Sequence, residues 1–137
     1  MPVLDTDFMI AIIRENEEAV RKIGEIEAET STNGVFTTTV NAFELFEGAF
    51  RIDAHKKGMK ELEFTREFLN SMDDILGFDY EASEIAGKIM AEMAVKGTPV
   101  GMADAMIAAI AMRNNERLIS RNAKHFSRIQ GLALEEW

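Results

Sequence analysis

The sequence predicts an α/β fold, a three-layer α/β/α sandwich around a mostly parallel central sheet. Short runs of β-branched and apolar residues alternate with helical runs of about 10–15 residues, which is typical of βαβ units. The chain has 137 residues, a length that suits one domain with a core able to fold unaided. Its 47% apolar content and 2 prolines exclude a disordered chain. We therefore expect residues 1–137 to form a single domain.

The first half of the chain is expected to contain two strands and three helices. Its short apolar and β-branched runs favour strands, and apolar side chains repeated at i, i+3 and i+4 favour helices. A cluster of Thr, Ser, Asn and Gly separates the two patterns and predicts a turn. In order, these elements are a strand at 2–4, helices at 8–13 and 16–29, the turn at 30–34, a strand at 35–40, and a helix that Asn41 caps.

The second half continues the alternation. A charged segment predicts a polar helix, and a very apolar segment that follows a Pro-Gly loop predicts a buried one. In order, we expect the polar helix at 54–72, a strand at 75–78, a helix at 80–95, a loop at 98–101, the apolar helix at 103–113, and strands at 117–120 and 132–135.

Composition excludes several classes of function. The chain has no Cys, which excludes disulfides, thiolate metal sites and thiol nucleophiles. The longest apolar run, Ala105–Met112, is far shorter than the roughly 20 residues that span a bilayer, and the start of the chain lacks the pattern of a signal peptide. We expect a soluble cytoplasmic protein without a membrane partner. The net charge of −9 argues at first sight against binding nucleic acid.

Three acidic residues lie at positions that do not belong to a solvated helix face. Asp5 directly follows the first strand, Glu44 follows the second, and Asp104 interrupts the apolar helix. Ligands of parallel sheets bind beyond the carboxyl ends of the strands, where these residues fall. Each has an alternative structural role, because Asp5 and Asp104 can cap helices and Glu44 can form a capping box with Asn41.

These three carboxylates repel one another if they converge at one edge of the sheet. A bound divalent cation would offset that repulsion. Buried carboxylates are costly unless they are paired or bind a metal. Oxygen ligands of this kind suit Mg²⁺ or Mn²⁺. The two histidines, His55 and His125, lie in different segments and give no histidine cluster for zinc.

Four segments, in this order and at this spacing, carry a resemblance to a known family. The chain resembles PIN-domain ribonucleases and, more narrowly, the VapC toxins of toxin–antitoxin pairs, over essentially its whole length. The matching segments are Val3-Leu4-Asp5-Thr6-Asp7, Thr39-Val40-Asn41-Ala42-Phe43-Glu44-Leu45, Gly101-Met102-Ala103-Asp104-Ala105-Met106-Ile107-Ala108-Ala109 and Leu118-Ile119-Ser120-Arg121-Asn122-Ala123-Lys124-His125-Phe126.

The resemblance implies an α/β/α sandwich that cleaves RNA phosphodiesters with a water activated by Mg²⁺ or Mn²⁺. By motif, Asp5, Glu44 and Asp104 take the places of the family's metal-binding acids. The fourth acidic position of the family falls on Asn122, which brings no charge and favours one metal ion over two. The resemblance also implies a homodimer and a cognate antitoxin whose segment covers the site.

Neighbouring polar residues complete the predicted site. Thr6 is expected to position the water or a phosphate, and Asp7 to ligate the metal or support a ligand. The segments 51–60 and 113–128 carry net charges of +3 and +4 by their Lys, Arg, Asp and Glu content. The alternative interpretation of these two basic segments is an ordinary solvated helix surface. The functional reading is contact with RNA phosphates, for which Arg121 and Lys124 are the candidates.

Two other functions compete with the nuclease. Asp5-Thr6-Asp7 resembles the DxD start of haloacid-dehalogenase-type phosphatases, although the later Lys and acidic pair of that class have no counterpart here. Alternatively, the loss of an acid at Asn122 leaves a catalytically weak domain that binds RNA or an antitoxin. Metal-dependent cleavage of RNA separates the nuclease from both.

Overall fold

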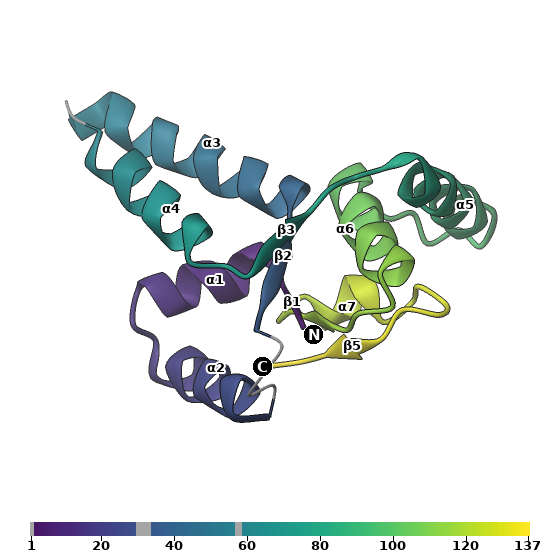
Figure 1. The fold of residues 1–137 in the computed structure, drawn as a ribbon. Coiled ribbons are helices and arrows are strands. Elements are labelled where there is room, and N and C mark those ends of the chain that lie inside the picture. The colour runs from purple at the N-terminus through teal and green to yellow at the C-terminus, as the bar shows by residue number, and fades with distance from the viewer. Residues whose placement is uncertain (1, 30–33, 57–58) are drawn as a thin grey trace.

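The computed structural model describes residues 2–29, 34–56 and 59–137, and they share one five-stranded sheet (Figure 1). The strand order is β3-β2-β1-β4-β5, and every neighbouring pair is parallel. An all-parallel sheet with intervening helices confirms the predicted α/β class. The strands are β1 (Val3–Leu4), β2 (Phe36–Thr38), β3 (Asp74–Leu76), β4 (Leu118–Ile119) and β5 (Leu134–Glu135).

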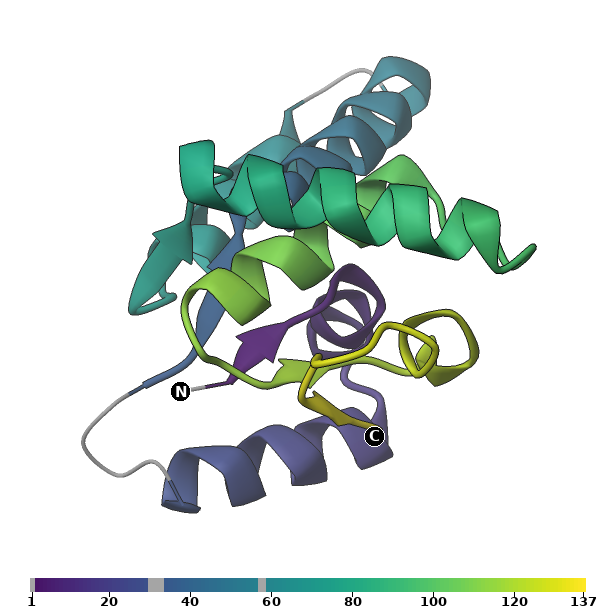
Figure 2. The same ribbon diagram turned by 90° about the vertical axis from the view of Figure 1, so that its right-hand side faces the viewer.

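Helices cover both faces of this sheet, as Figures 1 and 2 show together. Val3 and Leu118 pack in one core cluster with α5 and α6, whereas Leu4 and Ile119 pack in the other with α1 and α2. Successive residues of a strand point to opposite faces, so β1 and β4 each contribute one side chain to each core. The helices are α1 (Thr6–Ile13), α2 (Glu17–Glu29), α3 (Thr39–Lys56), α4 (Lys60–Asn70), α5 (Tyr80–Val95), α6 (Met102–Arg113) and α7 (Ala123–Phe126).

The second strand is shorter than predicted, because the chain turns helical at Thr39 rather than after Asn41. The Thr38 hydroxyl oxygen accepts a hydrogen bond from the Asn41 backbone N–H at 3.1 Å, which is the contact that a helix cap makes. The prediction that Asn41 caps this helix is therefore wrong. Thr38 takes that role, and the Asn41 side chain is free for other partners.

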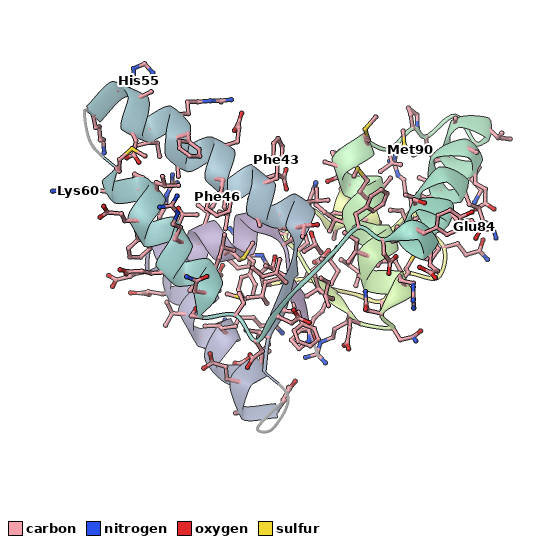
Figure 3. All side chains as sticks on the ribbon, turned by 45° about the horizontal axis from the view of Figure 1, so that its top comes forward. Phe43, Phe46, His55, Lys60, Glu84 and Met90 are labelled. Atoms are coloured by element: carbon pink, nitrogen blue, oxygen red, sulfur yellow. The ribbon has the colours of Figure 1, made fainter. Side chains whose placement is uncertain are left out.

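The predicted polar helix at 54–72 is also wrong, since two helices share this stretch. The helix α3 continues to Lys56 and α4 begins at Lys60. Asp53 is buried, and its carboxylate accepts hydrogen bonds from the backbone N–H groups of Glu61 (3.1 Å) and Leu62 (3.0 Å). These bonds satisfy free N–H groups at the start of α4. Figure 3 shows His55 and Lys60 at the far end of the paired helices.

The remaining differences are at element ends, where the predicted boundaries were wrong by a few residues. Helix α1 begins two residues earlier than predicted, because Thr6 and Asp7 join its first turn. Helix α6 begins one residue earlier, β3 begins one residue earlier and ends two residues earlier, and β4 and β5 are shorter than predicted. Helix α7 has only 4 residues and was not predicted. Of the predicted turn at 30–34, residues 30–33 lie outside the described part of the chain.

Gly34 is required by the entry into β2. Its φ of +66° is a conformation that side-chain-bearing residues rarely adopt, and an added Cβ would lie 1.9 Å from Asp73 Oδ2. The same Asp73 oxygen accepts the Val35 backbone N–H at 2.7 Å. Glycine therefore lets Asp73 approach the backbone and fix the start of the strand.

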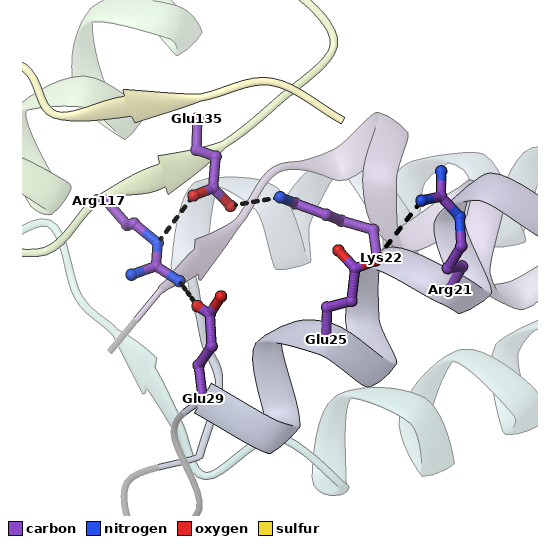
Figure 4. A network of polar contacts seen from close by, with 6 residues as sticks. All are labelled: Arg21, Lys22, Glu25, Glu29, Arg117 and Glu135. Atoms are coloured by element: carbon purple, nitrogen blue, oxygen red, sulfur yellow. Dashed lines mark hydrogen bonds and ion pairs between the residues drawn. The ribbon is translucent and has the colours of Figure 1, made fainter.

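Ion pairs join α2 to the β4–β5 edge of the sheet (Figure 4). Arg117 lies 3.3 Å from Glu29 and 3.7 Å from Glu135, and Lys22 lies 2.8 Å from Glu135. Such partly exposed pairs contribute about 0.2–1 kcal/mol each, so the network fixes the position of α2 more than it stabilises the fold. None of the described helices is both long and apolar enough to cross a membrane.

Candidate active site

A cavity opens where the strand order of the sheet reverses. The chain passes from β1 to β2 on one side, and β4 later pairs with β1 on the other. Parallel sheets bind ligands outside the carboxyl ends of their strands at such a point. The cavity has a volume of about 460 Å³. It is lined by Asp5, Thr6, Asp7, Ile10, Glu44, Asp104, Arg121 and Asn122.

Asp5 is the most buried acid of the cavity, with a relative exposure of 7%. Its Oδ1 accepts the Asn41 side-chain amide at 2.9 Å, and its Oδ2 accepts the Ser120 hydroxyl at 2.6 Å. Asp5 occupies the N-cap position of α1, but its side chain makes no capping hydrogen bond. The capping alternative is therefore wrong. Both carboxylate oxygens are oriented by these two residues, one in the first turn of α3 and one just after β4, and retain further lone pairs for a ligand.

Asn41 and Ser120 hold Asp5, and the sequence reasoning missed both roles. Asn41 is wholly buried and also donates to the Thr6 hydroxyl at 2.9 Å, while its own oxygen accepts the Thr38 hydroxyl at 2.6 Å. The Ser120 oxygen accepts the Asn122 backbone N–H at 2.9 Å. The available signal was position, because both are polar residues just beyond the ends of buried strands.

Glu44 reaches the cavity from the first turns of α3. Its Oε1 accepts the Thr6 hydroxyl at 2.7 Å, so the predicted capping box with Asn41 is not the contact that this carboxylate makes. Burial raises the pKa of Glu44, and the negative charges of Asp5, Asp104 and Asp7 raise it further, against the hydrogen bond from Thr6. Carboxylates that share one site repel one another, which makes the charged form of Glu44 less favourable.

Asp104 lies in the first turn of α6 and lines the same cavity as Asp5 and Glu44. Its side chain is 26% exposed, so it is partly buried at the edge of the cavity. Burial raises its pKa, as does the charge of Asp5, whereas His125 lowers it. His125 Nδ1 lies 3.6 Å from Asp104 Oδ2.

Asp7 adds a fourth carboxylate. Burial and the neighbouring charge of Asp5 raise its pKa, while the backbone N–H groups of Phe8 and Arg121 lower it. Its Oδ1 is buried and has no hydrogen-bond partner in the described part of the chain. A buried oxygen without a donor is costly and marks a position where a cation would be favourable.

The donor set suits a hard divalent cation. Four carboxylates line one cavity, and the charge of Asp5 helps to raise the pKa of Asp7, Glu44 and Asp104, an effect that a bound cation would oppose. Among the described residues, however, no group of three or more His, Asp or Glu side chains is arranged so that it could hold a metal ion. Mg²⁺ is commonly held by one or two carboxylates and keeps several waters, so an open arrangement of this kind fits it.

The other predicted site residues divide into two groups. Arg121 and Asn122 line the cavity, and the Asn122 amide lies 3.2 Å from the His125 ring. Lys124 is exposed on α7 and is not part of the cavity lining. The catalytic role of Asn122 and the phosphate contacts of Arg121 and Lys124 remain predictions.

Fold and site together define an α/β protein with a carboxylate-lined, cation-compatible cavity at the switch point of a parallel sheet. The family model of the PIN domain matches residues 3–132. A "tRNA(fMet)-specific endonuclease VapC" from Salmonella typhimurium is 30% identical over 135 residues, covering 98% of this chain and 96% of that protein. The chain therefore belongs to the PIN-domain family and is similar to its VapC members.

Solved structures agree with this assignment. The crystal structure of VapBC2 from Rickettsia felis bound to a promoter DNA fragment matches with a TM-score of 0.81 and 26% identity, over 99% of this chain and 98% of that chain. DNA-bound VapBC from Salmonella typhimurium matches with a TM-score of 0.79 and 28% identity, over 99% and 97%. Asp5-Thr6-Asp7 lies inside the PIN match, which removes the basis of the phosphatase alternative.

Proposed function

We propose that this protein is a divalent-metal-dependent endoribonuclease that acts as the toxin of a VapBC-type toxin–antitoxin pair. The observation that carries the proposal is the convergence of Asp5, Glu44 and Asp104 on one cavity, with both oxygens of Asp5 held by Asn41 and Ser120. Relatives named as VapC ribonucleases over nearly the whole chain support the same conclusion.

Asp5, Glu44 and Asp104 would hold the cation, with Asp7 beside them. Mg²⁺ or Mn²⁺, when bound, supplies an activated water and offsets negative charge on the phosphodiester in the transition state. The residues of this chain orient Asp5 and Glu44 by hydrogen bonds before the substrate arrives, and His125 lies 3.6 Å from Asp104. The Thr6 hydroxyl, between Asn41 and Glu44, orients the Glu44 carboxylate.

Arg121 would bind a phosphate of the RNA at the rim of the same cavity, and Lys124 would add charge from α7. Asn122, where the family often has an acid, would accept a hydrogen bond without adding charge, which favours a single resident ion. The negative net charge is thus compatible with an RNA substrate, since contact is limited to this edge. We place the protein in the cytoplasm with its RNA substrate.

The partners follow from the structural relatives. VapBC complexes are toxin–antitoxin assemblies, so we propose a cognate antitoxin protein that blocks the cavity, and a homodimer as the toxin's own state. An Arg or Lys from the antitoxin is the natural inhibitor of so acidic a cavity. Initiator tRNA is the first RNA to test, because the Salmonella relative is named for it.

Cleavage of RNA by the purified chain tests the proposal. Initiator tRNA and a mixed tRNA pool are incubated with Mg²⁺, with Mn²⁺ or with EDTA, and the products are separated by gel. We expect cleavage only with metal, and a loss of at least about 100-fold in Asp5→Asn and Asp104→Asn. Glu84→Gln, which changes an exposed carboxylate of α5 outside the cavity lining, is the matched control and should cleave normally. Metal-independent cleavage, or unchanged cleavage in both acid variants, would contradict the proposal, and RNA binding without cleavage would support the binding-domain alternative.

A further inference from the structure

Arg121 is held in an unusual way for a residue beside an acidic cavity. Its guanidinium carbon lies 3.7 Å from the centre of the Trp137 ring, and its Nη2 donates to Glu18 Oε2 on α2 at 2.8 Å. The Trp137 ring in turn packs against Phe8 of α1, with ring centres 5.0 Å apart. One face of the guanidinium therefore rests on an aromatic surface that is itself anchored in the core.

The sheet register produces this stack. β4 and β5 are parallel, with Leu118 opposite Leu134 and Ile119 opposite Glu135. The same offset of 16 residues, continued for two more positions, places Trp137 opposite Arg121. Side chains at paired positions of neighbouring strands lie side by side on one face. The Ser120 backbone N–H donates to the Glu135 carbonyl at 3.1 Å, so the two segments are still hydrogen-bonded one residue before Arg121.

We propose that Trp137 is a positioning residue that presents the Arg121 guanidinium to an RNA phosphate, and that Glu18 occupies the phosphate's place in the free protein. This inference rests on the proposed RNA-cleaving function and adds two residues to it. A guanidinium stacked on tryptophan keeps its N–H groups at the ring edge, where they can donate to a phosphate.

The exchange of Glu18 for phosphate is favourable on charge and exposure. Glu18 and Arg121 are 66% and 50% exposed, and an ion pair between such exposed groups is weak. A phosphate oxygen pair can accept two parallel hydrogen bonds from one guanidinium, which a single contact to Glu18 Oε2 does not match. Arg121 follows Ser120, which binds Asp5, so a phosphate at Arg121 would lie beside the carboxylates of the cavity.

Trp137 is the only tryptophan of the chain, so its fluorescence reports on this stack alone. In EDTA, where the proposed nuclease is inactive, a single-stranded oligoribonucleotide is titrated into the native protein. We expect a saturable change in tryptophan fluorescence that is absent in Arg121→Gln. The same RNA carrying a fluorophore gives the dissociation constant for variants without tryptophan.

The variants separate positioning from simple packing. We expect Trp137→Leu to weaken RNA binding about threefold to tenfold and Trp137→Phe to weaken it less. Arg121→Lys should weaken binding as much as Trp137→Leu, because lysine keeps the charge but cannot stack as a planar group. In the Arg121→Gln background, Trp137→Leu should have no further effect. Glu18→Gln should bind RNA about two- to threefold more tightly, because it removes a competing ion pair, whereas Glu25→Gln on the same helix should change nothing. Thermal unfolding of each variant identifies any that fold poorly, and Trp137→Phe keeps the test valid if Trp137→Leu is one of them.

Cleavage and binding distinguish failure of this inference from failure of the proposed function. If the native protein cleaves RNA with metal but Trp137→Leu weakens binding equally with and without Arg121, the inference is overturned and the function stands. If RNA binds with the expected pattern of variants but is not cleaved with metal, the function fails and the inference stands. No change of tryptophan fluorescence on saturation with RNA overturns the inference in either case.

Discussion

The Asn41 side-chain amide lies 2.9 Å from Asp5 Oδ1, and the two residues come from the starts of different helices across the β1–β2 pair. The same amide reaches the Thr6 hydroxyl, which donates to Glu44. One neutral residue thus links two of the proposed metal ligands. Because it is buried completely, its hydrogen bonds form in a low-dielectric surrounding where each matters more.

Replacing Asn41 should damage both stability and site. Asn41→Ala removes the side-chain donor to Asp5 Oδ1 and the oxygen that accepts the Thr38 hydroxyl proton, at a cost of about 1–3 kcal/mol in the free energy of unfolding. Asn41→Asp puts a second carboxylate against Asp5, so its cost should be larger at pH 7 than at pH 4, where protonation relieves the repulsion. Urea unfolding at both pH values measures the difference. A deficit for Asn41→Asp that does not shrink at pH 4 would contradict this role.

Ser120→Ala should weaken metal binding in addition to stability. It removes the 2.6 Å hydrogen bond to Asp5 and the acceptor of the Asn122 backbone N–H. Thr37→Val is a matched control, because it removes an equally buried hydroxyl whose hydrogen bond, to the Leu4 carbonyl at 2.9 Å, is outside the cavity lining. Each substitution should cost about 1–2 kcal/mol of stability. Calorimetric titration with Mn²⁺ should show weaker binding only in Ser120→Ala, and equal affinities would show that Ser120 is merely structural.

The sequence predicts the site's charged members better than its supporting ones. Asp5, Glu44 and Asp104 are visible because acids after buried strands or inside an apolar helix conflict with the local pattern. Asn41 conflicts with nothing, since Asn after a strand is an ordinary helix cap, and only the approach of β1 to α3 reveals its contact with Asp5. The stack of Arg121 on Trp137 depends on the pairing of β4 with β5, which no local pattern specifies.

The fold, like the site, could be predicted from the sequence only where it depends on local pattern. Alternating strands and helices predict the parallel sheet, because that pattern depends on local periodicity. The break within the predicted helix at 54–72 depends instead on Asp53, which binds N–H groups 8 and 9 residues further along the chain. Strand lengths were overestimated where β-branched residues such as Thr39 and Val40 lie in a helix whose packing overrides their β preference.

Asp53→Ala should destabilise the α3–α4 pair without affecting the cavity. It frees the N–H groups of Glu61 and Leu62 at the start of α4 and should cost about 1–2 kcal/mol, the scale of a lost helix cap. Asp53→Asn, which keeps one acceptor oxygen, should cost less. Urea unfolding gives the free energies, and hydrogen exchange should locate the faster-exchanging amides in α4. Uniform acceleration over the whole sheet would contradict a local role.

Asp104→Asn should stabilise the metal-free fold at neutral pH. The pKa values of Asp7, Glu44 and Asp104 are raised above their ordinary values, so the native chain binds more protons than the unfolded chain as pH passes through that window. Stability therefore falls as pH rises above the ordinary carboxyl range of about 4. In EDTA, the variant should melt at a higher temperature than the native chain at pH 7.5, and the two should converge below about pH 3.5. A variant that is less stable at pH 7.5 would show that the Asp104 charge is favourable without metal.

Added metal should reverse the order of stability, because a cation converts the repulsion into attraction. An ion that binds only the native chain stabilises it by about 1.4 kcal/mol at ten times its dissociation constant. Because no group of three or more His, Asp or Glu side chains in the described part of the chain is already arranged to hold a metal ion, we expect weak binding, so the melting temperature should keep rising into the millimolar range of Mg²⁺ or Mn²⁺. Asp5→Asn and Asp104→Asn should lose this rise, while Thr37→Val should keep it despite its lower starting stability. Na⁺ at equal ionic strength controls for screening, and an equal rise with Na⁺ would contradict a specific cation site at these carboxylates.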